Sequence, residues 1–222
     1  MIRRLEVAVF AIAFALAGLI ACAFLWSGEG PYRDLARANG AERFEFVVPP
    51  AGRQETDLET AVSLHGQWEG YVTGRTGEPP RSALPPFTAD EYAHMADVRR
   101  VFGGAKVVLA TAIIVIAIRL QRAWLRRDAL RLVRDGAVAA AVGVLVIGIA
   151  AAVAFDPLFL LFHEIFFPEG NFLFDPATSN LIRLYPDWYW QGITGLVAGS
   201  FIGLAAVVAG TCTLALRKLR TR

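Results

Sequence analysis

Three histidines are the side chains of this sequence best suited to move protons near neutral pH, since the pKa of a free imidazole is about 6.5. His94 lies in FTADEYAHMADVRRVF (Phe87–Phe102), and His163 lies in FHEIFFPEGNFLFDP (Phe162–Pro176). Both stretches also carry carboxylates, and the second contains five phenylalanines. Ionisable groups at such a greasy boundary indicate a functional site. His65, in the polar stretch SLHGQWEG, is interpreted as a surface or hydrogen-bonded structural histidine.

The elements that must position these histidines are membrane helices. The chain is 55% hydrophobic, and its net charge of +2, with no basic face interleaved with aromatics, gives no case for nucleic acid. The apolar runs predict an all-α polytopic membrane protein with four transmembrane helices. A small extracytoplasmic cap that can include β-strands is expected between spans 1 and 2. The predicted order is a first span within 1–26, an extracytoplasmic segment 27–101 ending in a helix that runs into span 2, a second span 102–118, a basic cytoplasmic loop 119–135, a third span 136–155, an aromatic-rich extracytoplasmic interface segment 156–191, a fourth span 192–216 and a basic cytoplasmic tail 217–222.

Positive charge gives the orientation, because basic residues are enriched on the cytoplasmic side of membrane proteins. Four spans place all three basic segments on one side: the start of the chain, the loop 119–135 and the tail 217–222. We therefore expect a multi-pass protein of the bacterial cell membrane with cytoplasmic termini. Both histidine stretches then face the extracytoplasmic side.

Local signals predict the helices that carry the histidines. Thr88 and Glu91 form a capping box, so a helix begins at Thr88 and continues into span 2. Asp90, His94 and Asp97 share one face of it. Asp–Pro pairs predict two further short helices, one beginning at Asp156 and one running from Asp175 to Leu184.

The remaining patterns concern packing. RFEFVV (Arg43–Val48) alternates like a strand, and WEGYVTG (Trp68–Gly74) is interpreted as a second one. Cys22 and Cys212 are expected to be buried and structural. Small residues in span 4 are expected to allow close helix packing; they include Gly195, Gly199, Gly203 and Gly210.

The two histidine stretches resemble a known family. FTADEYAHMADVRRVF and FHEIFFPEGNFLFDPATSNLIRLYPDWYW look like the two signature segments of the bacterial lipoprotein intramolecular transacylase (Lit) family. Members are integral membrane proteins with four spans and an extracytoplasmic domain. The stretches occur in the family's order, with the spans in the expected places, whereas 41–80 matches no motif of the family.

The resemblance implies acyl transfer. The substrate would be a lipoprotein whose N-terminal cysteine carries diacylglycerol on its sulfur, and the sn-2 acyl chain would move to the cysteine α-amine to give the lyso form. The family's two catalytic candidates carry over to His94 and His163. Contact with the substrate is expected from Asp97, Phe162, Phe166, Asn171, Asp175 and Tyr185.

Ester aminolysis fits this assignment. It needs an acceptor for the amine proton and a donor for the leaving oxygen, and two imidazoles can provide both. We expect His163 to be the base, because its surroundings are the more apolar. No cofactor and no metal are expected; the partners are diacylglyceryl-modified lipoproteins and membrane lipid.

Two other hypotheses fit the residues. His94 and His163, with Asp97 and Asp175, can hold zinc in a metal-dependent membrane hydrolase, although no HExxH motif is present. Alternatively, the protein is a non-enzymatic membrane scaffold with structural histidines. Chelator sensitivity would indicate the first, and unchanged function of histidine variants the second.

Overall fold

The computed structural model describes residues 2–81 and 85–221, and it is mostly helical. The chain divides into two compact units. The first contains Met1–Phe24, Ala105–Val153 and Gly195–Arg222, and the second contains Leu25–Gly104 and Ala154–Thr194. The elements in chain order are α1 (Ile2–Trp26), α2 (Glu29–Ala38), β1 (Arg43–Val48), β2 (Gly52–Asp57), α3 (Leu58–Val72), α4 (Ala89–Leu125), α5 (Ala129–Val153), α6 (Phe155–Phe166), α7 (Asn180–Leu184) and α8 (Asp187–Arg220).

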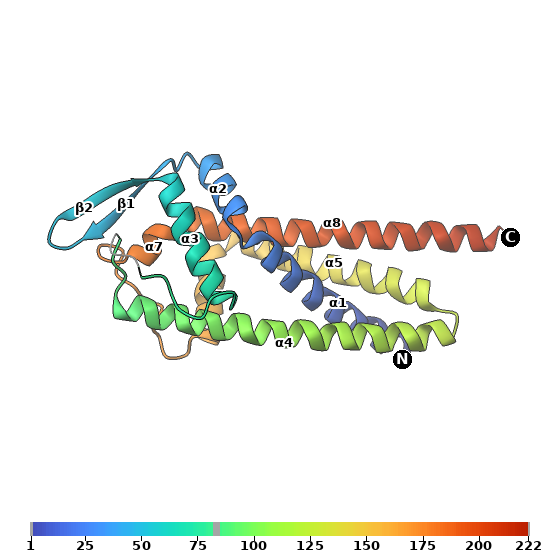
Figure 1. The fold of residues 1–222 in the computed structure, drawn as a ribbon. Coiled ribbons are helices and arrows are strands. Elements are labelled where there is room, and N and C mark those ends of the chain that lie inside the picture. Colours follow the sequence, from blue (N-terminus) through green and yellow to red (C-terminus); the bar gives the residue numbers. More distant parts are fainter. Residues whose placement is uncertain (1, 82–84, 222) are drawn as a thin grey trace. The chain divides into compact units, whose positions relative to one another are not determined.

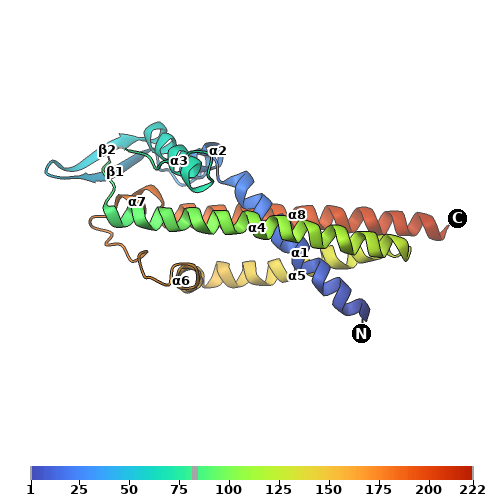
Figure 2. The same cartoon turned by 60° about the horizontal axis from the view of Figure 1, so that its bottom comes forward.

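The first unit is built from four long helices. Among the described residues, α1, α4, α5 and α8 are the helices long and apolar enough to cross a membrane. Their sections in this unit lie next to one another, with α1 at an angle to the other three (Figures 1 and 2). The prediction of four transmembrane helices in an all-α fold is confirmed.

Close packing in this unit occurs where a glycine of one helix meets an aromatic ring of another. A Cβ on Gly18 would lie 2.5 Å from the ring of Phe201, and one on Gly136 would lie 2.3 Å from the ring of Phe10. The span 4 glycines predicted to do this are different: Gly195, Gly199, Gly203 and Gly210 have open space where a Cβ would be. That expectation was wrong, because spacing identifies a small-residue row but not the direction it faces.

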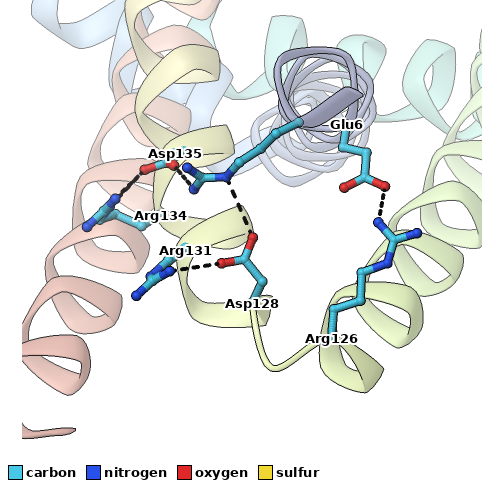
Figure 3. A network of polar contacts seen from close by, with 7 residues as sticks. Glu6, Arg126, Asp128, Arg131, Arg134 and Asp135 are labelled. Carbon is cyan, nitrogen blue, oxygen red and sulfur yellow. Dashed lines mark hydrogen bonds and ion pairs between the residues drawn. The ribbon is translucent and has the colours of Figure 1, made fainter. Parts of the chain in front are cut away.

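Ion pairs join the first turns of α1 to the α4–α5 connection and to the first turns of α5 (Figure 3). Arg3 Nη2 lies 2.6 Å from Asp135 Oδ2, and Arg126 Nη1 donates to Glu6 Oε1 at 2.8 Å. Figures 1 and 2 both place the C-terminal end of α8 at this same end. The three basic segments of the sequence therefore gather at one end of the unit. Of the tail, Arg222 lies outside the described residues.

The second unit has a mixed α/β core. β1 and β2 form an antiparallel hairpin with Arg43 opposite Asp57, and α2 and α3 lie beside it (Figure 1). The largest buried side chains are Trp68 and Tyr32. The strand predicted at Arg43–Val48 is confirmed as β1, with Phe44 and Phe46 buried on one face.

The second predicted strand was wrong. WEGYV is the end of helix α3, whose first turn is capped by Asp57 accepting from the amide of Thr60 at 2.8 Å. The buried apolar side chains of α3 recur at helical spacing: Leu58, Ala61, Val62, Leu64, Trp68, Tyr71 and Val72. Burial at intervals of three and four residues is the helical period, and it overrides the β-propensity of the aromatic residues.

The helix carrying His94 begins as predicted, and the two short helices begin elsewhere. The side chain of Thr88 accepts from the amide of Glu91 at 3.2 Å, and Glu91 accepts from the amide of Thr88 at 2.7 Å. Helix α6 begins at Phe155, with Asp156 inside its first turn. Asp175 begins only a turn, and α7 begins five residues later behind an N-cap at Ser179.

Candidate active site

His94 and His163 lie together in the second unit. Their rings stack at a centroid distance of 6.1 Å with an interplanar angle of 18°, although one comes from α4 and the other from α6. They are 6% and 9% exposed. The structure therefore brings the two histidines predicted from the sequence into one buried pair.

Aromatic rings surround the pair. Phe167 and Phe174 lie 4.7 and 5.5 Å from the ring of His94. Phe159 and Phe172 lie 4.2 and 5.2 Å from the ring of His163. These rings keep water away from both imidazoles, which strengthens any electrostatic interaction between them and a bound group.

Helix α6 presents His163 through its four-residue spacing. Phe159, His163 and Phe167 recur every fourth residue and are the less exposed side chains of this stretch. Most of the other apolar side chains of α6 are exposed, among them Leu160, Leu161, Phe162, Ile165 and Phe166. One narrow face of α6 thus builds the site, while the rest of the helix presents an apolar surface.

A backbone hydrogen bond fixes the tautomer of His163. Its Nδ1 lies 2.8 Å from the carbonyl oxygen of Phe159. Because a carbonyl only accepts, Nδ1 must carry the proton. In the neutral ring, Nε2 of His163 therefore has a free lone pair and can accept a proton.

Burial keeps both imidazoles neutral at a lower pH than a free imidazole. It lowers the pKa of His163, against a smaller opposing effect of the hydrogen bond to Phe159. Burial also lowers the pKa of His94, which lies before the apolar section that begins near Phe102. The neighbouring His163 is the second cause of this lowering. Asn171 and Asp97 oppose the lowering at His94. Both rings are thus available as proton acceptors near neutral pH.

Asp97 and Asn171 form a polar pair beside His94. Asn171 Nδ2 donates a hydrogen bond to Asp97 Oδ2, and the other carboxylate oxygen pairs with Arg100. Asp97 lies one turn after His94 on α4, so both project from the same side of the helix. The structure therefore places two of the predicted substrate-contacting residues next to the histidine pair.

Glu91 holds the loop that closes the site. Its carboxylate is fully buried and accepts at 2.7 Å from the hydroxyl of Ser179 and from the amide of Leu181. This ties the first turn of α4 to α7 and to the loop before it, which contains Asn171 and Phe174. Sequence reasoning assigned Glu91 only a capping role, because the pattern shows its contact within the helix and not the loop that packs on it.

The other predicted residues have different surroundings. Phe162 lies 5.5 Å from the ring of His163, Phe166 packs on Phe162 at 4.7 Å, and both are nearly half exposed. Asp175 is exposed, and its carboxylate accepts from the amide of Ala177 within its own turn at 2.8 Å. Tyr185 packs on Trp190, which packs on Phe159, so it reaches His163 only through two other rings.

Tyr185 belongs to a separate buried cluster around His65. His65 is 2% exposed, and its Nε2 donates to the carbonyl of Ser27 at 2.8 Å. Its Nδ1 then accepts from the hydroxyl of Tyr185 at 3.2 Å. Both ring nitrogens are satisfied, which confirms His65 as a hydrogen-bonded structural histidine, buried instead of at the surface.

Four ring neighbours were missed by the sequence reasoning as site residues: Phe159, Phe167, Phe172 and Phe174. The spacing of Phe159 and Phe167 on either side of His163 was a readable signal, because positions four apart share a helix face. Phe172 and Phe174 gave none, since both lie in an irregular loop. Among the described residues, no group of three or more His, Cys, Asp and Glu is placed to hold a metal ion. The metal-dependent hydrolase hypothesis therefore gains no support from ligand geometry.

Four apolar helices and a buried histidine pair outside their most apolar sections define the class: a multi-pass membrane protein with a candidate acid–base site. A comparison with protein families then gives the particular family. The chain belongs to the lipoprotein intramolecular transacylase family, Lit, whose model matches residues 67–190, more than half of the chain. It is accordingly a membrane-integral transacylase. The match contains both histidine stretches.

Solved structures share the fold. The in meso structure of the membrane integral lipoprotein intramolecular transacylase Lit from Bacillus cereus matches with a TM-score of 0.78, at 14% identity, over 100% of this chain and 99% of that one. A variant of the same protein with one histidine replaced by arginine matches with a TM-score of 0.74, at 15% identity, over 99% and 94% of the two chains. A variant with a histidine replaced by alanine matches with a TM-score of 0.74, at 14% identity, over 100% of this chain and 96% of that one. A comparison with curated protein sequences gives no match.

Proposed function

We propose that the protein moves the sn-2 acyl chain of an S-diacylglyceryl-cysteine lipoprotein to the cysteine α-amine, which yields the lyso form. The observation that carries the proposal is the buried His94–His163 stack in a chain of the transacylase family. Amine and ester are on one molecule, so holding them together supplies much of the rate enhancement.

The proton balance assigns two tasks. The amine nitrogen bonds to the acyl carbonyl carbon, and the bond from that carbon to the sn-2 oxygen breaks. A terminal α-amine has a pKa of about 8, so it arrives largely as ammonium and loses two protons. One proton goes to the sn-2 oxygen and the other to solvent.

His163 is the proposed base. Its Nδ1 is committed to the carbonyl of Phe159, so Nε2 takes the proton that leaves nitrogen as the C–N bond forms. His94 takes the first ammonium proton and, as imidazolium, donates it to the sn-2 oxygen. The stacked rings let one proton acceptor and one proton donor reach the same reacting centre.

The exposed apolar surface of α6 fits the lipid part of the substrate. Phe162 lies next to His163, Phe166 packs on Phe162, and both rings remain accessible, so we assign them to the acyl chain. Asp97 and Asn171 line the polar side of the histidine pair. Asp175 and Tyr185 would contact the substrate only at the margin of this site.

The proposed orientation places the termini and the α4–α5 connection in the cytoplasm. The gathering of Arg3, Arg126 and the basic end of α8 at one end of the first unit supports it, because cytoplasmic segments are enriched in Lys and Arg. Residues 27–101 and 156–191 then face outward. Within the membrane helices, the sections proposed to cross the bilayer are 102–118, 136–155 and 192–216, together with the apolar part of 1–26.

Mass spectrometry of one lipoprotein's N-terminal peptide tests the proposal. The chain is expressed in a host that makes only diacylglyceryl lipoprotein. The product has the same total acyl mass, and fragmentation is expected to show one chain on nitrogen. An unchanged diacylglyceryl peptide, with the protein shown to be folded in the membrane, would overturn the proposed reaction.

Two histidine variants test the site, and a third is the matched control. His94→Gln and His163→Gln are expected to abolish N-acylation while the protein still accumulates in the membrane. His65→Gln removes a hydrogen-bonded structural histidine, so it is expected to lower thermal stability and to leave acyl transfer measurable at low temperature. Full activity of both site variants would show that the histidines are structural.

A further inference from the structure

Asn171 has a fixed orientation in the loop after α6. Its Nδ2 donates to Asp97 Oδ2. The reversed amide would place its oxygen against a carboxylate oxygen, so the amide can adopt only one of its two orientations. The amide oxygen, Oδ1, therefore points away from Asp97.

That oxygen is buried and lacks a hydrogen-bond partner among the described residues. The same holds for Nδ1 of His94. Buried polar atoms without partners are uncommon and cost roughly 1–3 kcal/mol each, so each calls for an explanation. One atom is an acceptor, and the other is a donor whenever it carries the ring proton.

The surrounding contacts bring the two side chains together. His94 and Asp97 are one turn apart on α4, and Asn171 is bonded to Asp97. Phe172 and Phe174, which follow Asn171 in the loop, contact His163 and His94 respectively. Asn171 also counters the lowering of the pKa of His94, although the two side chains lack hydrogen-bond geometry in this state.

We infer that Asn171, held by Asp97, is a positioning residue for His94: its Oδ1 accepts the Nδ1–H of His94 when that ring takes up a proton. This interaction fixes the ring and directs Nε2 of His94 towards the reacting centre. The inference rests on the proposed function, and it replaces the expected substrate contact of Asn171 with an action through His94.

The charges around His94 agree with this role. Asp97 contributes a negative charge through Asn171, partly offset by Arg100, which pairs with its other oxygen. Burial keeps His163 neutral, against a smaller opposing effect of its bond to the carbonyl of Phe159. Glu91, one turn before His94, is committed to Ser179 and to the amide of Leu181. Asn171 with Asp97 is thus the group that favours an imidazolium at His94. The corresponding group at His163 is only the backbone carbonyl of Phe159, which carries no charge.

Two kinetic signatures separate positioning from substrate binding. Asn171→Leu keeps a similar volume and removes both polar atoms. If Asn171 positions His94, this variant lowers kcat by up to about 100-fold and leaves KM for the lipoprotein nearly unchanged, because the misplaced group acts only in the reaction. If Asn171 binds substrate directly, KM rises while kcat is kept, and the inference is overturned.

Asn171→Asp gives a second readout that a merely structural role would not move. A carboxylate beside His94 favours its charged form, so the pKa of His94 rises. We expect the basic limb of the kcat pH profile to move to higher pH. Nitrogen-15 NMR of the His94 ring, in detergent-solubilised protein, is expected to show Nδ1 protonated in the wild type and a higher titration midpoint in Asn171→Asp.

The NMR measurement is independent of catalysis, so it separates the two ideas. Wild-type protein without acyl transfer refutes the proposed function, whatever the spectrum shows. Active wild type with inactive His94→Gln, but unchanged kcat in Asn171→Leu and an unchanged His94 midpoint in Asn171→Asp, refutes only the positioning role. Asp97→Asn keeps an oxygen for the Asn171 amide and removes the charge, so it is expected to lower the His94 midpoint and to reduce kcat less than Asn171→Leu does.

Discussion

Replacement of Glu91 by alanine tests how the loop over the histidines is held. The carboxylate is 0% exposed and accepts from the hydroxyl of Ser179, the amide of Leu181 and the amide of Thr88, all at 2.7 Å. In Glu91→Ala the first two donors stay buried without an acceptor, and the capping box is lost.

The magnitude follows from these contacts. Two unpaired buried donors cost about 1–3 kcal/mol each, and a lost helix cap costs about 1 kcal/mol. Removal of a buried carboxylate also removes its own desolvation cost, so we expect the lower end, a destabilisation of about 3 kcal/mol. For a chain of this size that corresponds to a fall in Tm of roughly 10 °C. Glu91→Gln keeps one oxygen for Ser179 and Leu181 and loses only the Thr88 contact, so about 1 kcal/mol is expected.

Thermal unfolding in detergent, followed by circular dichroism, measures the series, and acyl transfer below the transition measures its effect on the site. Activity is expected to fall with Glu91→Ala even where the protein is folded, because the loop carrying Asn171 and Phe174 is no longer tied to α4. Glu55→Ala on exposed β2 is the control and should change Tm little. If Glu91→Ala is as stable as wild type, or if glutamine and alanine are equivalent, the buried carboxylate does not hold the loop.

Three further outcomes are expected. Burial lowers the pKa of His65 to about 4, so between about pH 4 and 6.5 the unfolded chain binds a proton that the folded chain does not bind. The free energy of unfolding should therefore fall by about 3 kcal/mol as the pH drops through that window, and by less in His65→Gln. Denaturant unfolding measures both. Gly18→Ala, which places a Cβ against an aromatic ring, should destabilise by about 1–3 kcal/mol, whereas Gly199→Ala, which faces open space, should not; equal Tm values would refute this packing. Phe162→Ser and Phe166→Ser should each raise KM for the lipoprotein and change kcat little, and an unchanged KM would remove these rings from the acyl-binding surface.

The histidine pair was predictable from local sequence in part. The capping box placed His94 on a helix of known start, and the aromatic run marked His163 as unusual. The four-residue spacing of Phe159, His163 and Phe167 also indicates which face of α6 is buried. The tautomer of His163 was not predictable, because it depends on which carbonyl the ring reaches once α6 has packed.

The cap was predicted less well, for a physical reason. Trp68 and Tyr71 have high β-propensity, but burial of Trp68 against Phe87 is available only to a helix in this packing arrangement. In the same way, the Asp–Pro signal at Asp175 marks a turn, and it was wrongly interpreted as the capped start of a helix. Helix α7 instead begins at Asn180, after the N-cap residue Ser179. The side chain of Ser179 is hydrogen-bonded to Glu91, and that of Asn180 is hydrogen-bonded to the backbone of β1.

The sequence by itself determined the elements with strong local signals: four apolar helices, the start of α4 and the gathering of basic residues that suggests an orientation. These follow from hydrophobic run length, capping chemistry and charge, each of which acts within a few residues. Only the tertiary structure decided which polar atoms meet. It stacked His94 on His163, joined Asn171 to Asp97 and assigned His65 to a separate buried cluster. Such contacts join residues far apart in the chain, and they arise only when the whole unit packs and each buried polar group must find a partner.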